Sequence, residues 1–149
     1  HGQYGKEFHM LKFRSMAEGS DYTDQPVTID DPRVTMIGKV IRKTSIDEIP
    51  QLLNVLRGEM SLVGPRPHII AETNLYSKKI LRFLSRHQVK PGITGLAQIR
   101  TRGKTDNLDL MQEKLSSDLE YINNWSIYLD LTILLSTPLS LWKNKDTNV

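Results

Sequence analysis

The sequence predicts one helix-rich domain of the α/β (α+β) class, with a small β-hairpin or sheet and a helix at its C-terminal end. Apolar residues lie three or four positions apart over residues 46–57, as on one face of a helix. Short apolar stretches at 60–67 and 89–99 are interrupted by proline and glycine, which is typical of strands and turns. Hydrophobic residues make up 38% of the 149 positions, so the chain can bury a core.

The N-terminal part is expected to hold short elements. Apolar residues within 8–13 follow a glycine-containing turn and predict a hairpin strand that ends in basic residues. Residues 17–32 are polar and acidic and contain prolines, which predicts a loop. Residues 34–42 form a helix candidate with their apolar side chains on one side.

The clearest helix spans residues 46–57 and is stopped by Gly58, because glycine readily takes the left-handed conformation that ends helices. Pro50 lies inside this range, so the helix is expected to begin later or to bend. One apolar face runs along it. That face consists of Ile46, Ile49, Leu53 and Leu56.

The second half of the chain is expected to be mainly helical. Residues 68–87 predict one helix and residues 108–123 another, while 89–99 predict a loop and a short strand. Residues 125–142 are mostly apolar with a tryptophan at each end. Two interpretations of this last segment stay open: a core helix, or an interfacial helix that touches lipid headgroups.

The composition excludes some classes of site and favours others. The chain has no cysteine, so it forms neither disulfides nor thiolate metal sites, and its four histidines show no metal-ligand spacing. The net charge is +3, with basic residues concentrated between Arg33 and Lys104. Such a region favours an anionic partner, which could be nucleic acid, a phosphate ligand or a membrane surface. A slightly basic soluble surface is the simpler explanation of the composition alone.

The chain opens without an initiator methionine or a recognisable signal peptide. No run approaches the roughly 20 apolar residues of a membrane-spanning helix. We therefore expect residues 1–149 to be a single domain from the C-terminal part of a longer protein.

Asp47 and Glu48 form the first candidate site. Ser45 and Glu48 have the spacing of a capping box, in which serine caps a helix and the glutamate three residues later reaches back. In that interpretation the carboxylates only complement the helix dipole. The alternative is chemical, because adjacent carboxylates at a helix start lie about 100° apart. One could then attack a phosphoryl group while the other handles a proton or a metal ion.

Two turns rich in glycine and proline are the next candidates. In residues 64–67 two prolines fix the backbone around Arg66, whose guanidinium can present paired donors to a phosphate. A rigid connector is the alternative. Residues 91–95, with Gln98 beyond them, could offer backbone donors to an anion, although an ordinary turn at the start of a strand also explains the pattern.

The order of these motifs resembles one family. Residues 44–67 read TSIDEIPQLLNVLRGEMSLVGPRP, and they are flanked by KFRSM at 12–16, VKPGITGLAQ at 89–98 and DLEYINNWS at 118–126. Together these blocks resemble the bacterial sugar transferases, the monotopic phosphoglycosyl transferases that act on polyprenyl phosphate. They are most similar to the undecaprenyl-phosphate glucose and galactose phosphotransferases.

The resemblance implies a fold and an activity. The fold would be a compact α/β catalytic domain at the cytoplasmic face of the bacterial inner membrane. The activity would move a hexose 1-phosphate from a UDP-sugar to undecaprenyl phosphate and so initiate capsule, exopolysaccharide or O-antigen synthesis. The membrane surface would be a partner, nucleic acid would not, and the oligomeric state stays open.

The resemblance also implies roles for individual residues. Asp47 would be the nucleophile that forms a covalent phosphosugar intermediate and would bind the cofactor Mg²⁺. Glu48 would complete the catalytic dyad. Substrate contacts would come from Lys12, Arg14, Pro65, Arg66, Pro67 and Gln98.

The chain departs from the family pattern at two places. Family members often carry Asn-Gly where this chain has Arg100 and Thr101 ahead of Arg102, and an arginine where it has Lys114. A nucleic-acid binding module and a non-enzymatic module at the membrane surface are the rival interpretations. No aromatic and basic platform supports the first, and the second requires Asp47 and Glu48 to be only a capping box.

Overall fold

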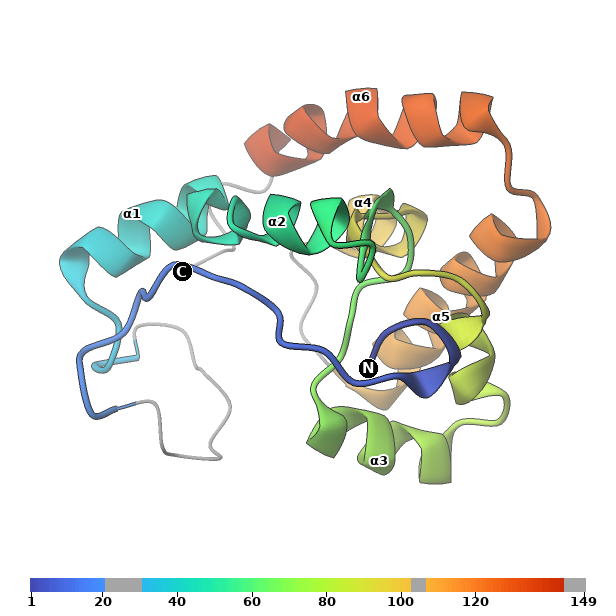
Figure 1. Ribbon diagram of the computed structural model, residues 1–149, viewed down its shortest axis with the longest axis horizontal. Coiled ribbons are helices and arrows are strands. Elements are labelled where there is room, and N and C mark those ends of the chain that lie inside the picture. Colours follow the sequence, from blue (N-terminus) through green and yellow to red (C-terminus); the bar gives the residue numbers. More distant parts are fainter. Residues whose placement is uncertain (21–30, 103–106, 144–149) are drawn as a thin grey trace.

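The computed structural model describes residues 1–20, 31–102 and 107–143. Within these ranges the chain is mostly helical and contains a small sheet, which confirms the predicted fold class (Figure 1). The sheet pairs β1 (Ser61–Val63) with β2 (Gly92–Thr94) in parallel, with Ser61 opposite Gly92. A Cβ at Gly92 would lie 2.1 Å from the backbone nitrogen of Gly64, so this close strand contact requires glycine.

The N-terminal segment crosses the molecule without forming the predicted hairpin. After a short 3₁₀ turn, η1 (Gln3–Gly5), residues 8–13 are not in a strand, and that prediction was wrong. Their backbone groups find side-chain and loop partners instead. The amide of Leu11 donates to Asn54 Oδ1 at 3.0 Å, and Asn54 Nδ2 donates to the carbonyl of His9 at 2.9 Å.

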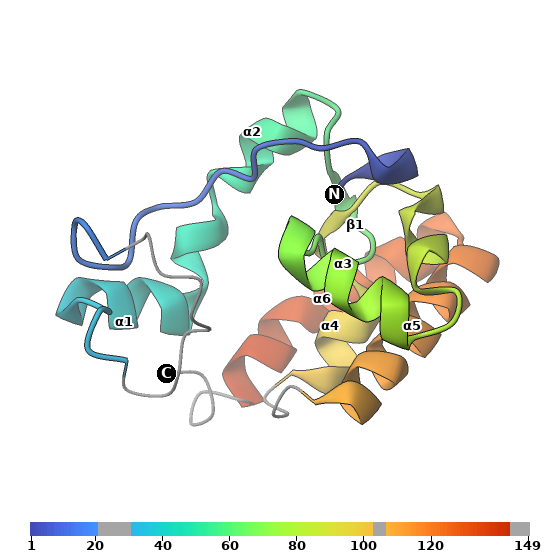
Figure 2. The same ribbon diagram turned by 90° about the horizontal axis from the view of Figure 1, so that it is seen from below.

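Helix α1 (Met36–Thr44) begins two residues later than predicted because Thr35 caps it. The Thr35 hydroxyl accepts from the amide of Gly38 at 2.9 Å. Figure 2 shows α1 standing apart from α3 and α5, and its residues Met36, Ile37 and Val40 are exposed.

The predicted helix over 46–57 is divided at Pro50 into a 3₁₀ turn, η2 (Ile46–Glu48), and α2 (Gln51–Leu56). Its apolar face points outward, and Leu56 at the end of that face is 82% exposed. The buried face is polar. That buried face consists of Asp47, Gln51 and Asn54.

The single helix predicted over 68–87 is also divided. It forms α3 (Ile70–Lys79) and a 3₁₀ segment, η3 (Phe83–Gln88), because Arg82 takes a left-handed conformation between them with φ of 62°. Ile80 and Phe83 at this break are buried, so the corner is fixed by packing.

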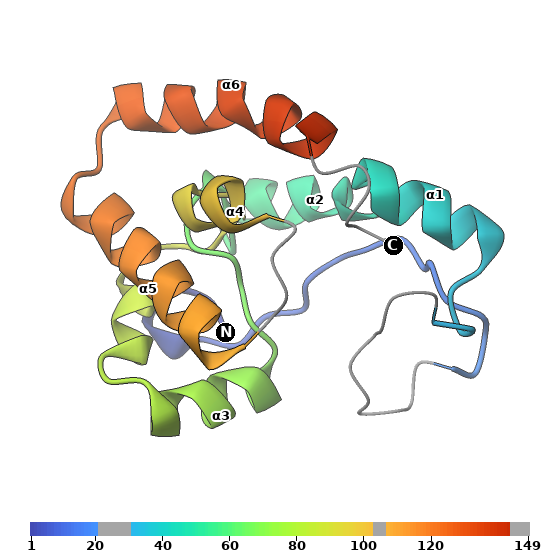
Figure 3. The same cartoon turned by 180° about the vertical axis from the view of Figure 1, so that it is seen from behind.

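Three helices complete the fold. Helix α4 (Leu96–Thr101) replaces the end of the predicted loop and strand, α5 (Leu108–Asn123) has the predicted bounds, and α6 (Ile127–Lys143) follows. Helix α4 packs against both α5 and α6. Figures 1 and 3 show α6 on one side of the molecule and α3 on the opposite side.

Among the described residues, two apolar clusters form the core. One joins β1 to the three C-terminal helices through Val63, Leu96, Tyr121 and Ile133. The other joins the α3–η3 corner to α5 through Ile80, Phe83, Met111 and Leu115.

Helix α6 has one face in the core and one outside it. Ile133 is fully buried, while Leu131, Leu135 and Leu139 are exposed. The start of the helix is tied down by Asp130, whose Oδ1 accepts from the Tyr121 hydroxyl at 2.8 Å. Among the described residues, no helix combines the length and apolar character that crossing a bilayer requires.

Truncating the buried face of α6 should cost far more stability than truncating its exposed face. Ile133→Ala removes a fully buried side chain and should lower the free energy of unfolding by about 2–5 kcal/mol. Leu135→Ala, which changes a side chain that is 76% exposed, should change it by less than about 0.5 kcal/mol. Denaturant unfolding followed by circular dichroism measures both, and equal losses would contradict this placement of α6.

Candidate active site

A cleft of about 780 Å³ lies where several elements converge. Its lining comes from the N-terminal segment, the α1–η2–α2 region, the turn after β1, β2, the α4 region, α5 and the C-terminal part of α6. The charged side chains along it are Lys12, Arg42, Asp47, Glu48, Arg66, Arg102 and Lys114. Among the described residues of the lining, five cations outnumber two carboxylates, so this part of the cleft is suited to an anion.

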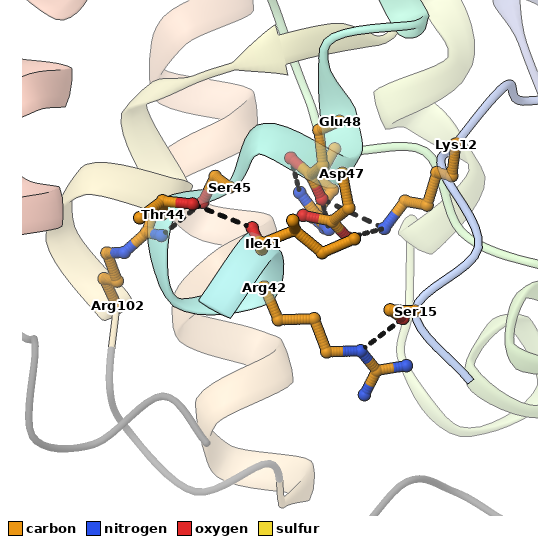
Figure 4. Close-up of polar contacts among 10 residues, drawn as sticks. Lys12, Ser15, Ile41, Arg42, Thr44, Ser45, Asp47, Glu48 and Arg102 are labelled. Atoms are coloured by element: carbon orange, nitrogen blue, oxygen red, sulfur yellow. Dashed lines mark hydrogen bonds and ion pairs between the residues drawn. The ribbon is translucent and has the colours of Figure 1, made fainter. Parts of the chain in front are cut away.

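The capping-box interpretation of Ser45 and Glu48 was wrong. Ser45 makes no side-chain cap and takes a left-handed conformation with φ of 56°. Its hydroxyl accepts from Arg102 Nη2 at 3.1 Å (Figure 4). The left-handed conformation costs a non-glycine residue free energy, and strained residues of this kind are found most often at functional sites.

The Glu48 carboxylate is held by two cations. Oε1 accepts from Lys12 Nζ at 3.0 Å and from Arg66 Nη2 at 2.6 Å, and Oε2 accepts from Arg66 Nη1 at 3.4 Å. Burial opposes the charged form, but Arg66 and then Lys12 more than offset it and lower the pKa of Glu48 to about 2. Glu48 is therefore ionised throughout the physiological range.

Asp47 is held differently although it is the next residue. Its side chain is buried, and Oδ2 lies 3.9 Å from Lys12 Nζ, beyond hydrogen-bond distance. Burial raises the pKa of Asp47; Lys12 opposes this shift, and Glu48 adds to it. The two carboxylates thus have unequal roles, with Glu48 engaged by cations and Asp47 left to face the cleft.

The N-terminal segment places Lys12 beside these carboxylates. The amide of Phe13 donates to the carbonyl of Asp47 at 2.9 Å. On the other side of Lys12, the amide of Leu11 donates to the side chain of Asn54, which is fully buried. Figure 4 shows Lys12 pointing toward Asp47 and Glu48 from the side opposite Arg102.

Gln98 lines the cleft from α4. Its Nε2 donates to the carbonyl of Ile93 at 2.8 Å, and its Oε1 is buried with no hydrogen-bond partner among the described residues. A buried acceptor without a partner costs free energy unless a ligand satisfies it. Gln98 Oε1 is therefore a candidate acceptor for a donor on a ligand.

The other residues predicted to contact substrate do not line the cleft. Arg14 lies outside the cleft, and its side chain is exposed and 3.9 Å from Glu18 Oε1. Pro65 is buried and Pro67 half-buried, and neither lines the cleft. The two prolines shape the turn that carries Arg66.

Some residues of the cleft were not predicted as site residues. Arg102 and Lys114 had been noted only as departures from a family pattern, and their basic character was the available signal. Burial lowers the pKa of the Arg102 guanidinium, an effect that Glu48 opposes. Arg42 also lines the cleft, and its Nε donates to Ser15 Oγ at 2.7 Å. No sequence motif marked Arg42 as a site residue.

The donor set is compatible with magnesium. Among the described residues no group of three or more His, Cys, Asp or Glu side chains is placed to hold a metal ion. Magnesium does not need such a cage, because it commonly binds one or two carboxylates together with substrate phosphates and water. Asp47, whose carboxylate is not taken by a direct ion-pair hydrogen bond, fits that requirement.

Curated relatives match nearly all of the chain. A UDP-glucose:undecaprenyl-phosphate glucose-1-phosphate transferase of Caulobacter vibrioides is 48% identical over 94% of this chain and 53% of its own length. An Escherichia coli protein of the same name is 46% identical over 97% of this chain and 32% of its own. The galactosyl transferase CpsE of Streptococcus agalactiae is 44% identical over 91% of this chain and 32% of its own.

The chain thus spans between about a third and about half of the length of these relatives. The sequence model of one family, described as bacterial sugar transferase, matches residues 1–144. A match of that extent covers every element of the fold and every residue of the cleft. The chain belongs to the bacterial sugar transferase family.

Proposed function

We propose that this chain is the catalytic domain of a phosphoglycosyl transferase, which moves a hexose 1-phosphate from a UDP-sugar to undecaprenyl phosphate. One observation carries the proposal: Asp47 faces a cationic cleft while its neighbour Glu48 is engaged by Lys12 and Arg66. The names of the relatives support the same substrates and the same transfer. Such a reaction is the first step of capsule, exopolysaccharide or O-antigen synthesis.

The proposed reaction has two steps. An oxygen of the Asp47 carboxylate attacks the phosphorus that carries the sugar, and the bond from that phosphorus to the uridine monophosphate oxygen breaks. Uridine monophosphate leaves with the electron pair, and the sugar phosphate stays on Asp47 as an acyl phosphate. An oxygen of undecaprenyl phosphate then attacks the same phosphorus, and Asp47 leaves as a carboxylate.

The cations of the cleft make this attack feasible. A carboxylate that approaches a diphosphate meets like charge, so the reaction needs positive groups fixed in advance. Arg66, Lys12 and Arg102 supply them. Glu48 holds Arg66 and Lys12 in position, because both donate to its carboxylate within the lining of the cleft even before a substrate arrives.

Magnesium is the proposed cofactor, held by Asp47 together with substrate oxygens. When bound, it neutralises phosphate charge and stabilises the transferring group. The protein's own part is to fix the backbone at Asp47 through the hydrogen bond from the Phe13 amide, with the Asp47 side chain in the lining of the cleft.

The membrane surface is the proposed partner, and the cytoplasmic face of the inner membrane is the proposed location. An undecaprenyl chain is apolar and stays in a bilayer, so the domain must reach its phosphate from the lipid surface. Exposed apolar residues on α6 and on the η2–α2 region suit that position. Both segments border the cleft, which supports delivery of the lipid phosphate to Asp47.

Asp47→Asn should abolish transfer while leaving the fold intact. Asparagine is nearly isosteric with aspartate, but it cannot form the acyl phosphate, so turnover should fall by several orders of magnitude. Glu48→Gln should also be severely impaired, because it releases Lys12 and Arg66. Radiolabelled sugar transfer in membranes, with circular dichroism as the folding control, measures this. Near-parent turnover by Asp47→Asn would return Asp47 to a structural role.

Arg66→Ala should weaken nucleotide-sugar binding more than it weakens folding. A charged contact to phosphate is typically worth about 1.5–3 kcal/mol, whereas Arg66 is partly exposed and contributes little packing. Titration calorimetry with a UDP-sugar and thermal unfolding should be compared on the same samples. Arg57→Ala, an exposed arginine at the end of α2, is the matched control. Equal affinity in Arg66→Ala and parent would remove Arg66 from the site.

The exposed face of α6 should bind anionic bilayers. Replacing Leu131, Leu135 and Leu139 together by serine removes apolar area from that face without touching Ile133, so liposome binding should fall while the melting temperature stays close to parent. Flotation with phosphatidylglycerol vesicles measures binding, and tryptophan fluorescence reports contact. If neither the parent nor the variant responds to lipid, α6 is a core helix only.

A further inference from the structure

A buried ion pair lies behind the cleft and takes no part in lining it. Arg86 in η3 and Asp118 in α5 approach within 2.8 Å, between Nη2 and Oδ2, and their side chains are 3% and 2% exposed. The Arg86 guanidinium also lies over the Phe83 ring, 5.4 Å from its centroid. Ionised groups this deep are rare unless something holds them there.

The same nitrogen of Arg86 makes a second contact. Nη2 donates to the backbone carbonyl of Arg66 at 2.7 Å, across 20 residues of sequence. Asp118 Oδ2, by contrast, accepts no hydrogen bond among the described residues, so its contact with Arg86 is ionic rather than directional. The hydrogen bond that Arg86 donates therefore goes to the turn that carries Arg66.

That turn has few other constraints. Pro65 and Pro67 fix their own φ angles, and the carbonyl of Pro65 accepts from the amide of Gly92 at 2.9 Å. The Arg66 side chain itself is 44% exposed, and Glu48 holds its guanidinium end by hydrogen bonds. At the backbone end of the residue, the hydrogen bond from Arg86 to the Arg66 carbonyl sets the orientation of that peptide group.

We propose that Arg86 is a positioning residue for the transfer reaction. It holds the Arg66 carbonyl, and thereby aims the Arg66 guanidinium at Glu48 and the cleft, while Asp118 neutralises Arg86 in the interior. The role in the reaction rests on the proposed function, whereas the aiming of Arg66 can be measured without any turnover.

Energetics separate this role from simple stabilisation. Removing one partner of a buried pair leaves an uncompensated charge and is strongly destabilising, whereas replacing both partners by apolar residues is often neutral or stabilising. A double variant, Arg86→Met with Asp118→Leu, should therefore preserve the fold and remove the bond to Arg66, while methionine takes the place of the guanidinium over the Phe83 ring. If the pair serves stability alone, nothing in the cleft should change.

The first readout is the Arg66 guanidinium, followed by NMR as the exchange of its Nη protons with water at one neutral pH. In the parent chain the hydrogen bonds from Arg66 to Glu48 should protect these protons from exchange. In the double variant Arg66 should move away from Glu48, and its Nη protons should exchange as fast as those of the exposed Arg57. The second readout is transfer by the complete protein in membranes, where turnover should fall about 10- to 100-fold because a small displacement of a charged group is costly to rate.

The matched control is a second arginine–carboxylate pair, whose carboxylate lies on the same helix as Asp118. Arg100 Nη2 donates to Glu120 Oε1 at 2.8 Å, and both side chains are about half exposed. Arg100→Met with Glu120→Leu removes an ion pair that joins α4 to α5 without touching Arg66. It should leave the exchange of the Arg66 Nη protons and the turnover at parent values.

Unchanged exchange of the Arg66 Nη protons together with parent turnover in a folded double variant overturns the proposal. If the double variant does not fold, Arg86→Lys replaces it, because lysine keeps the buried charge beside Asp118 on a different, shorter donor group. Arg86→Lys should fold and speed the exchange of the Arg66 Nη protons, and exchange as slow as in the parent overturns the proposal again. If this exchange becomes faster but the parent protein transfers no sugar phosphate, the proposed function fails and the aiming of Arg66 stands.

Discussion

The Glu48 carboxylate, shared between Lys12 and Arg66, is the interaction on which the site depends. It brings together three segments that are distant in sequence: the N-terminal segment, η2 and the turn after β1. A cation pair of this kind would repel itself without the carboxylate between it. Glu48 therefore keeps two phosphate-binding groups at the cleft, and Asp47 beside it stays available for chemistry.

The η2–α2 region that carries this carboxylate packs with polar side chains inside. Its buried face is polar because the extended N-terminal chain lies against it and has backbone groups that need partners, which Asn54 supplies. The apolar side chains are consequently left outside, as at Leu56. An apolar surface beside a cleft for a lipid phosphate is an arrangement that a membrane enzyme can use.

Sequence reasoning was accurate where local chemistry decides the outcome. The bounds of α5 were predicted, and the structure adds the Asn107 side chain that caps its first turn. Over residues 46–57 the helix is interrupted at Pro50, where a late start or a bend was expected, and its apolar face is exposed. The strand expected over 8–13 did not form. Asp47, Lys12, Arg66 and Gln98 were predicted through motif resemblance and meet in the cleft. The Ser45–Arg102 contact joins residues 57 positions apart, so no local sequence pattern predicts it.

The central claim is that Asp47 becomes covalently bonded to the transferred group. Intact-protein mass spectrometry of the membrane-extracted protein, after brief exposure to a UDP-sugar and magnesium without undecaprenyl phosphate, tests it directly. The account predicts a mass increase of one hexose phosphate, located by fragmentation on the peptide carrying Asp47 and released on addition of undecaprenyl phosphate. An enzyme that transfers sugar at its normal rate with no such adduct, or with the adduct on another residue, would contradict the account.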